Sequence, residues 1–163
     1  MKARFFLNQP GGREQEAARP TRAPIDFHRR LPGYEPTPLR DAPELARLLR
    51  IGQVLVKDES SRLGLPAFKI LGASWAVYRA LAARAAQAEG RASARPGLAA
   101  ASPSGILEPF QTIDELAERL APMRPLTLAT ATDGNHGRAV AHVAALFGFA
   151  ARIYVPAGTA PAR

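Results

Sequence analysis

A lysine in an apolar run that otherwise looks buried, residues 68–73, offers the clearest chemistry in this sequence. Lys69 lies between Phe68 and Ile70, and its type is rare here, because only Lys2, Lys57 and Lys69 among the 22 basic residues are lysines. A lysine amine loses its proton readily when it is desolvated and then attacks aldehydes, whereas a guanidinium stays charged. Lys69 is therefore a candidate Schiff-base lysine. The alternative is a lysine whose stem covers apolar surface while its ammonium reaches water.

A second group of polar residues falls on a predicted strand-to-helix turn. Residues 126–131 alternate small, β-branched and aliphatic side chains, as a short buried strand does. Further along, one face of an amphipathic helix ended by Gly148 is formed by Val140, Val143, Ala144 and Phe147. The turn between strand and helix holds Thr132, Asp133, Gly134, Asn135 and His136.

Such a turn suits the binding of an anion. It presents free backbone N–H groups and the positive end of a helix dipole, which together attract carboxylates and phosphates. Gly134 and Gly137 are predicted to let a ligand approach the backbone, and Asn135 offers both a donor and an acceptor. The alternative is a purely structural turn, which Asp-Gly and Asn-rich sequences often form.

Together the two windows resemble the fold type II enzymes that depend on pyridoxal phosphate. The shared motifs are Ala-Phe-Lys at residues 67–69, Gly-Asn-His-Gly at 134–137, the Thr-Pro-Leu segment at 37–39 and the strand end at 57–60. Within this superfamily, residues 57–69 and 132–138 are most similar to diaminopropionate ammonia-lyase. Asp133 supports that choice, since the dehydratases and synthases usually have Ser or Thr at this position. The resemblance covers residues 30–163.

The resemblance implies a set of roles. Lys69 would hold the cofactor and then serve as base beside the substrate Cα, while Asp133 would pair with the β-ammonium or act as a second base from the opposite face. In the family, the aspartate is regarded as the base for the D isomer and the lysine as the base for the L isomer. Asn135 would bind the cofactor ring hydroxyl, and the N–H groups from Thr132 to His136 would hold the substrate carboxylate. His136 itself receives no certain role, and a histidine hydrogen-bonded at a helix start is the simpler interpretation.

The implied fold is α/β, a partial fold type II architecture with a mostly parallel sheet and flanking helices, incomplete at the C-terminus. Residues 1–24 are predicted to be a flexible extension and 25–163 the N-terminal part of a lyase domain, with a flexible insertion at about 90–105. Within the lyase part, a strand is predicted at 53–57, a helix with two apolar stripes at 67–89, and a capping box at Thr112 and Glu115. At 163 residues the chain has less than half the length that the family needs. No glycine-rich phosphate loop follows the turn, so we expect a complementary C-terminal half to be needed.

Composition narrows the remaining possibilities. The net charge of +8 would fit nucleic-acid binding, but the arginines are dispersed, so no nucleic-acid partner is expected. The chain has no cysteine, which fits a cytoplasmic protein, and its three histidines lack metal-ligand spacing. No run approaches the roughly 20 apolar residues of a membrane span. The expected ligands are pyridoxal phosphate and a small amino acid, and family members are usually homodimers.

Three functional hypotheses follow from the sequence. The first is an ammonia-lyase that converts 2,3-diaminopropionate to pyruvate and ammonia by α,β-elimination, present here in a truncated form; a threonine or serine dehydratase is its near relative. The second is a non-catalytic remnant of such a lyase. The third is a basic binding module, which rests on charge alone.

Overall fold

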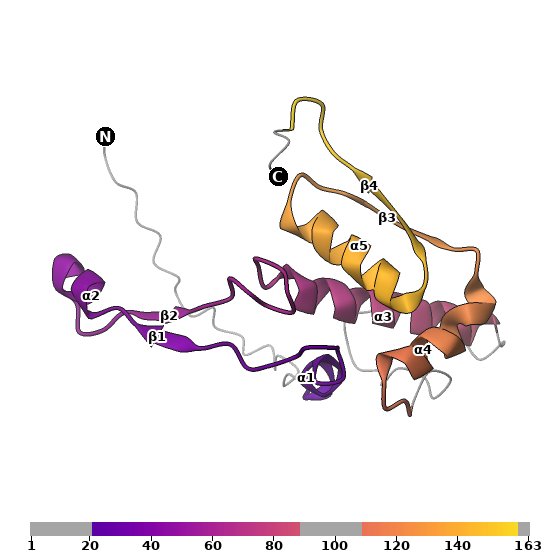
Figure 1. Ribbon diagram of the computed structural model, residues 1–163, viewed down its shortest axis with the longest axis horizontal. Coiled ribbons are helices and arrows are strands. Elements are labelled where there is room, and N and C mark those ends of the chain that lie inside the picture. Colours follow the sequence, from indigo (N-terminus) through magenta and orange to yellow (C-terminus); the bar gives the residue numbers. More distant parts are fainter. Residues whose placement is uncertain (1–20, 89–108, 160–163) are drawn as a thin grey trace, which may run out of the picture.

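Two helices packed side by side organise the chain. In the computed structural model, which describes residues 21–88 and 109–159, α3 (Lys69–Ala88) lies against α5 (Asn135–Phe147). Both helices begin at the same end of the molecule, on the left of this pair in Figure 1. Their contact buries Ile70, Ala73 and Leu81 of α3 together with Val140, Val143 and Ala144 of α5.

A β-α-β unit carries the predicted turn. Strand β3 (Thr127–Ala131) pairs in parallel with β4 (Ala150–Tyr154), and α5 is the crossover that joins them. Figure 1 shows α5 between α3 and the two strands. The helix ends as predicted at Gly148, whose φ of 73° is a left-handed conformation that favours glycine.

An aromatic cluster attaches the first helix to α3. The Phe27 ring of α1 (Ala23–His28) stacks on Tyr78 with ring centroids 4.8 Å apart, and it also meets Trp75 and Phe110. Helix α3 is therefore packed on two sides, as its two apolar stripes predicted. Helix α1 itself was not predicted, and it begins inside the segment expected to be a flexible extension.

Helix α4 (Ile113–Leu120) and the 3-10 turn η1 (Ala121–Met123) precede β3. The predicted cap is present, because the Thr112 side chain accepts a hydrogen bond from the Glu115 backbone N–H at 3.2 Å. The return bond differs from a standard capping box: the Glu115 carboxylate accepts from the Gln111 N–H, at 2.8 Å.

An arm extends away from these helices (Figure 1). It consists of β1 (Leu39–Asp41), α2 (Pro43–Leu49) and β2 (Leu55–Lys57), with β1 and β2 antiparallel. Its exposed apolar residues are Leu39, Leu45, Leu48, Leu49, Ile51, Leu55 and Val56. The strand predicted at 53–57 is present but shorter, and β1 is an element that the sequence did not reveal.

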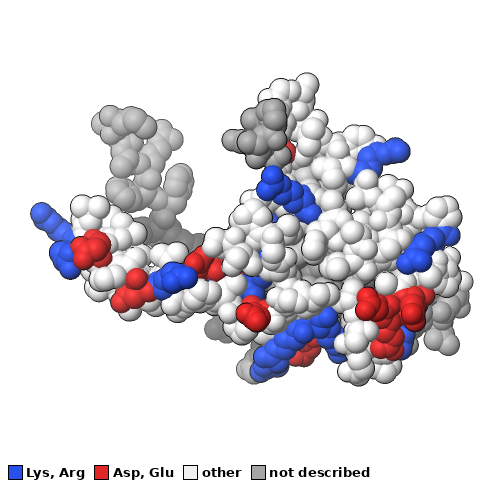
Figure 2. All heavy atoms as spheres, viewed as in Figure 1, with Lys and Arg blue, Asp and Glu red and all other residues white. Residues whose placement is uncertain are grey.

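Charged side chains of both signs are spread over the face in Figure 2, and acidic ones gather where α4 lies. Among the described residues no helix is both long and apolar enough to cross a membrane. The predicted insertion at 90–105 and most of the predicted extension lie outside the described residues.

A buried histidine joins α1 to the start of α3. His28 is 9% exposed, and its Nε2–H donates to the Leu71 carbonyl at 2.8 Å. Burial is the main reason why the pKa of His28 falls below its ordinary value of 6.5; the bond to Leu71 opposes this shift, and the nearby Arg62 charge adds to it. The folded state thus disfavours protonated His28.

We predict that the protein loses stability as the pH falls below 6.5, because the unfolded chain then binds a proton that the folded chain resists. The loss attributable to His28 is at most about 1.4 kcal/mol per pH unit. Urea unfolding of the wild type and of His28→Gln at several pH values between 8 and 5 measures it. Identical pH dependence in the two proteins would contradict the role of His28.

Candidate active site

Lys69 is the first residue of α3, and its side chain is exposed. The amine lies 5.1 Å from the centroid of the Phe68 ring. The sequence suggested a buried setting, and this is half wrong: Ile70 is fully buried, but Phe68 is 58% exposed. The buried face belongs to α3, which begins at Lys69. Phe68 precedes the helix and is not part of that face. The amine is therefore open to a ligand.

The predicted turn lies between β3 and α5. Gly134 is the N-cap residue of α5, and no side chain caps the helix there. Thr132 continues the pairing of the strands, because its N–H donates to the Tyr154 carbonyl at 2.9 Å. This N–H is therefore not available to a substrate carboxylate, which corrects the prediction for Thr132. Asp133 and Asn135 are exposed. The positive end of the helix beside them suits an anion.

A groove shows that Lys69 and the turn lie at the same end of the molecule. It has a volume of about 400 Å³ and runs between α3 and β3 along the flank of α5. Ala73, one helical turn after Lys69, lines it together with Thr130 at the end of β3 and His136 at the start of α5. The two predicted windows are thus brought together, and His136 faces the groove that joins them.

The two glycines of the turn serve different purposes. A Cβ at Gly134 would meet nothing within 4 Å, which agrees with room for a ligand. A Cβ at Gly137 would lie 2.7 Å from Ile153 Cγ2 and 2.9 Å from Thr132 Cγ2. The interpretation of Gly137 as a site of ligand approach was therefore wrong: Gly137 is buried and allows α5 to pack on the strands.

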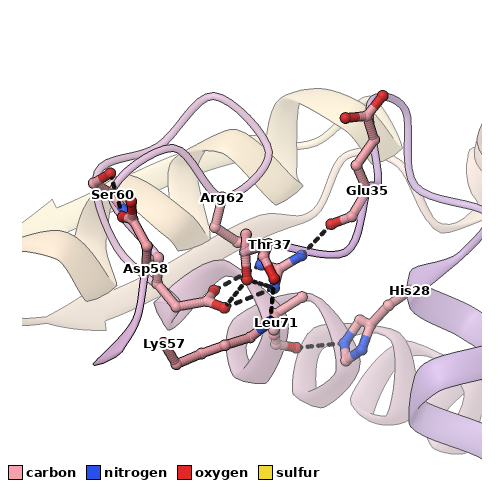
Figure 3. A network of polar contacts seen from close by, with 9 residues as sticks. His28, Glu35, Thr37, Lys57, Asp58, Ser60, Arg62 and Leu71 are labelled. Atoms are coloured by element: carbon pink, nitrogen blue, oxygen red, sulfur yellow. Dashed lines mark hydrogen bonds and ion pairs between the residues drawn. The ribbon is translucent and has the colours of Figure 1, made fainter. Parts of the chain in front are cut away.

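A buried ionic network lies beside the approach to Lys69 and was missed as a feature of the site (Figure 3). The Arg62 guanidinium donates from Nε and Nη2 to the two carboxylate oxygens of Glu59, each at 2.7 Å. It also donates to the Thr37 hydroxyl at 2.7 Å and to the Glu35 carbonyl at 2.6 Å. The only sequence signal was an acidic and a basic residue three positions apart, which is common on surfaces.

Both acidic residues of this loop are strongly stabilised as carboxylates. The hydrogen bonds from Arg62 are the main cause that lowers the pKa of Glu59 to about 2. The Ser60 hydroxyl, followed by Arg40, lowers the pKa of Asp58 to about 2 as well. These groups stay ionised at neutral pH, so neither Asp58 nor Glu59 is suited to proton transfer there.

The residues described here suit the aldehyde and the ring of pyridoxal phosphate. An exposed lysine amine can take the aldehyde, and Asn135 at an uncapped helix start can hydrogen-bond the ring. Residues 110–163 match the family described as pyridoxal-phosphate dependent enzyme. These residues are thus similar to a segment of this family, and the chain has a partial fold type II structure.

The relatives found in sequence are diaminopropionate ammonia-lyases. The Escherichia coli (strain K12) enzyme is 36% identical over 137 residues, which are 84% of this chain and 29% of that protein. The Salmonella typhimurium (strain LT2) enzyme is 36% identical over 135 residues, or 83% of this chain and 29% of that protein. The chain thus spans less than a third of the length of these curated relatives.

Solved structures agree. The apo form of the Escherichia coli enzyme has a TM-score of 0.63 and 35% identity, covering 84% of this chain and 32% of that one. The same enzyme in complex with an aminoacrylate-PLP azomethine reaction intermediate has a TM-score of 0.57 and 34% identity, covering 86% and 29%.

The packing of Gly137 can be tested by substitution. We predict that Gly137→Ala lowers the free energy of unfolding, because overpacking costs about 1–3 kcal/mol and exceeds the gain of about 1 kcal/mol in helix propensity. Gly72→Ala is the matched control, since a Cβ there meets nothing within 4 Å, and it should raise stability. Urea unfolding measures both; an equal increase in both variants would contradict the packing role.

Proposed function

We propose that this chain forms the lysine and substrate-turn part of a pyridoxal-phosphate-dependent ammonia-lyase that converts 2,3-diaminopropionate to pyruvate and ammonia. The observation that supports it most is that α3 and α5 pack together and begin at the same end, α3 at Lys69 and α5 after the uncapped Gly134. The names of the relatives support the substrate.

When bound, pyridoxal phosphate supplies an aldehyde for a lysine amine and an electron-withdrawing ring that favours loss of the Cα proton. Lys69 would hold the aldehyde carbon until the substrate amine replaces it. The freed Lys69 amine would then accept the Cα proton of the L isomer. Asn135 would hydrogen-bond the ring hydroxyl and so fix the plane of the ring relative to Lys69.

The turn would recognise the substrate. Backbone N–H groups from Asp133 to His136 would hold the substrate carboxylate at the positive end of α5. The Asp133 carboxylate would attract the β-ammonium that distinguishes 2,3-diaminopropionate from serine and threonine, or take the Cα proton of the D isomer. A threonine or serine dehydratase has no use for this charge.

The phosphate-binding part would come from outside the elements described. Residues 21–88 and 109–159 include no glycine-rich loop after the turn. We therefore propose that the cofactor phosphate is bound by polypeptide that corresponds to the part of the relatives that this chain does not span. A cytoplasmic homodimer is expected on the family resemblance alone.

The cofactor assignment predicts selective labelling of Lys69. With micromolar pyridoxal phosphate followed by borohydride, peptide mass spectrometry should find the label on Lys69 ahead of Lys2 and Lys57. Lys69→Ala should lose this label, whereas Lys2→Arg, which removes another lysine amine, is the control and should keep it. Equal labelling of all three lysines would overturn the assignment.

The substrate assignment predicts a charge-dependent preference. The pyridoxal-phosphate-loaded protein is titrated with 2,3-diaminopropionate and with serine, and the change in cofactor absorbance is followed. Asp133→Asn should weaken the response to 2,3-diaminopropionate roughly tenfold, the value of one screened ion pair, and spare serine. Asp133→Glu retains the charge and is the control. Equal weakening for both amino acids would argue against recognition of the β-ammonium.

A further inference from the structure

The loop that leads to Lys69 contains a strained turn. Arg62 and Leu65 form an antiparallel bridge, closed by the Leu65 N–H donating to the Arg62 carbonyl at 3.0 Å. The two residues between them, Leu63 and Gly64, have φ values of 52° and 75°, as in a type I′ turn. Leu63 has a Cβ, so its left-handed conformation costs about 1–2 kcal/mol. Other contacts must keep this turn closed.

The Arg62 side chain supplies those contacts. It is 5% exposed and lies with its guanidinium 5.6 Å from the centroid of the Tyr34 ring. Its bonds to Glu59, Thr37 and the Glu35 carbonyl use the whole planar fork, a geometry that a lysine cannot reproduce. One buried cation therefore ties the turn to the segment before β1 and to the residues after β2.

A second set of bonds holds that segment in place. The Lys57 amine donates to the Thr37 carbonyl, and the Thr37 hydroxyl donates to the Glu59 carboxylate. The Asp58 N–H donates to the Pro38 carbonyl at 3.0 Å, which prolongs the pairing of β1 with β2. The network is thus attached to the strand pair β1 and β2 on one side and to the loop before Lys69 on the other. Figure 3 shows its polar contacts.

A buried ion pair is a poor source of net stability, because desolvation offsets most of the attraction. Its geometry, however, is strict. The chain continues from this turn through Phe68 into α3. The position of the turn therefore sets the orientation of the loop that ends at Lys69, the first residue of the helix.

We infer that Arg62 is a positioning residue: through Glu59 and Thr37 it holds the turn at Arg62–Leu65 so that the Lys69 amine faces the start of α5. This inference rests on the proposed function. Arg62 touches neither substrate nor cofactor in this scheme, and it acts only through the backbone that leads to Lys69.

The test compares the rate of borohydride-trapped labelling of Lys69 by pyridoxal phosphate in wild type, Arg62→Lys and Arg62→Ala. Free Nα-acetyl-lysine, which keeps its side-chain amine, is the reference in the same tube. Labelling of Lys69 should fall roughly ten- to hundredfold in both variants, as expected for a displaced reacting group. Millimolar methylguanidinium should restore labelling in Arg62→Ala. Arg40→Ala removes the exposed pair with Asp58 on the same arm and should label like wild type.

Hydrogen exchange of residues 61–71, measured without cofactor, separates positioning from general unfolding. In Arg62→Lys this segment should exchange faster while the amides of α5 keep their wild-type protection. Selective labelling of Lys69 in wild type that persists unchanged in both Arg62 variants would overturn the positioning role and leave the proposed function intact. Absence of selective labelling in wild type would overturn the proposed function and the positioning role with it.

Discussion

The packing of α3 against α5 is the contact on which the rest of the structure depends. The two helices bury their apolar faces on each other, and both start at the same end. The first residue of α3 is a lysine, and the first residues of α5 follow an uncapped glycine. A shift of one helix along the other would separate these two chemical features. Their packing therefore sets the geometry of the candidate site.

Small residues make this close packing possible. Ala73, Ala139 and Ala144 are buried, and Gly137 brings the first turn of α5 onto Thr132 and Ile153. The same feature leaves the groove beside β3, where Ala73, Ala76 and Ala80 of α3 leave space unfilled. The small side chains of these helices thus allow the helix pair to pack closely and also leave the groove near Lys69.

Much of this could be predicted from the sequence, for local reasons. The strand before Thr132, the helix ended by Gly148 and the cap at Thr112 each depend on a few neighbouring residues. The roles proposed for Lys69 and Asn135 come from their types and from a family resemblance. The family match and the shared fold with diaminopropionate ammonia-lyase confirm that resemblance.

Features that depend on distant contacts were not predictable. His28 is buried because α1 packs on α3, and Arg62 is buried because residues 34–37 fold over it. Neither pattern has a local signature. Phe68 was expected to be buried and is exposed, because α3 begins only at the next residue.

The central claim, that Lys69 and the start of α5 face the same space, can be measured as a proximity. The chain has no cysteine, so the pair Lys69→Cys and Asn135→Cys introduces the only thiols. A short bifunctional thiol reagent should link this pair in high yield. The control pair of Lys69→Cys and Ala145→Cys places the second thiol ten residues along α5, about 15 Å away, and should stay unlinked. Equal yields for both pairs, or linkage of the control pair alone, would contradict the account.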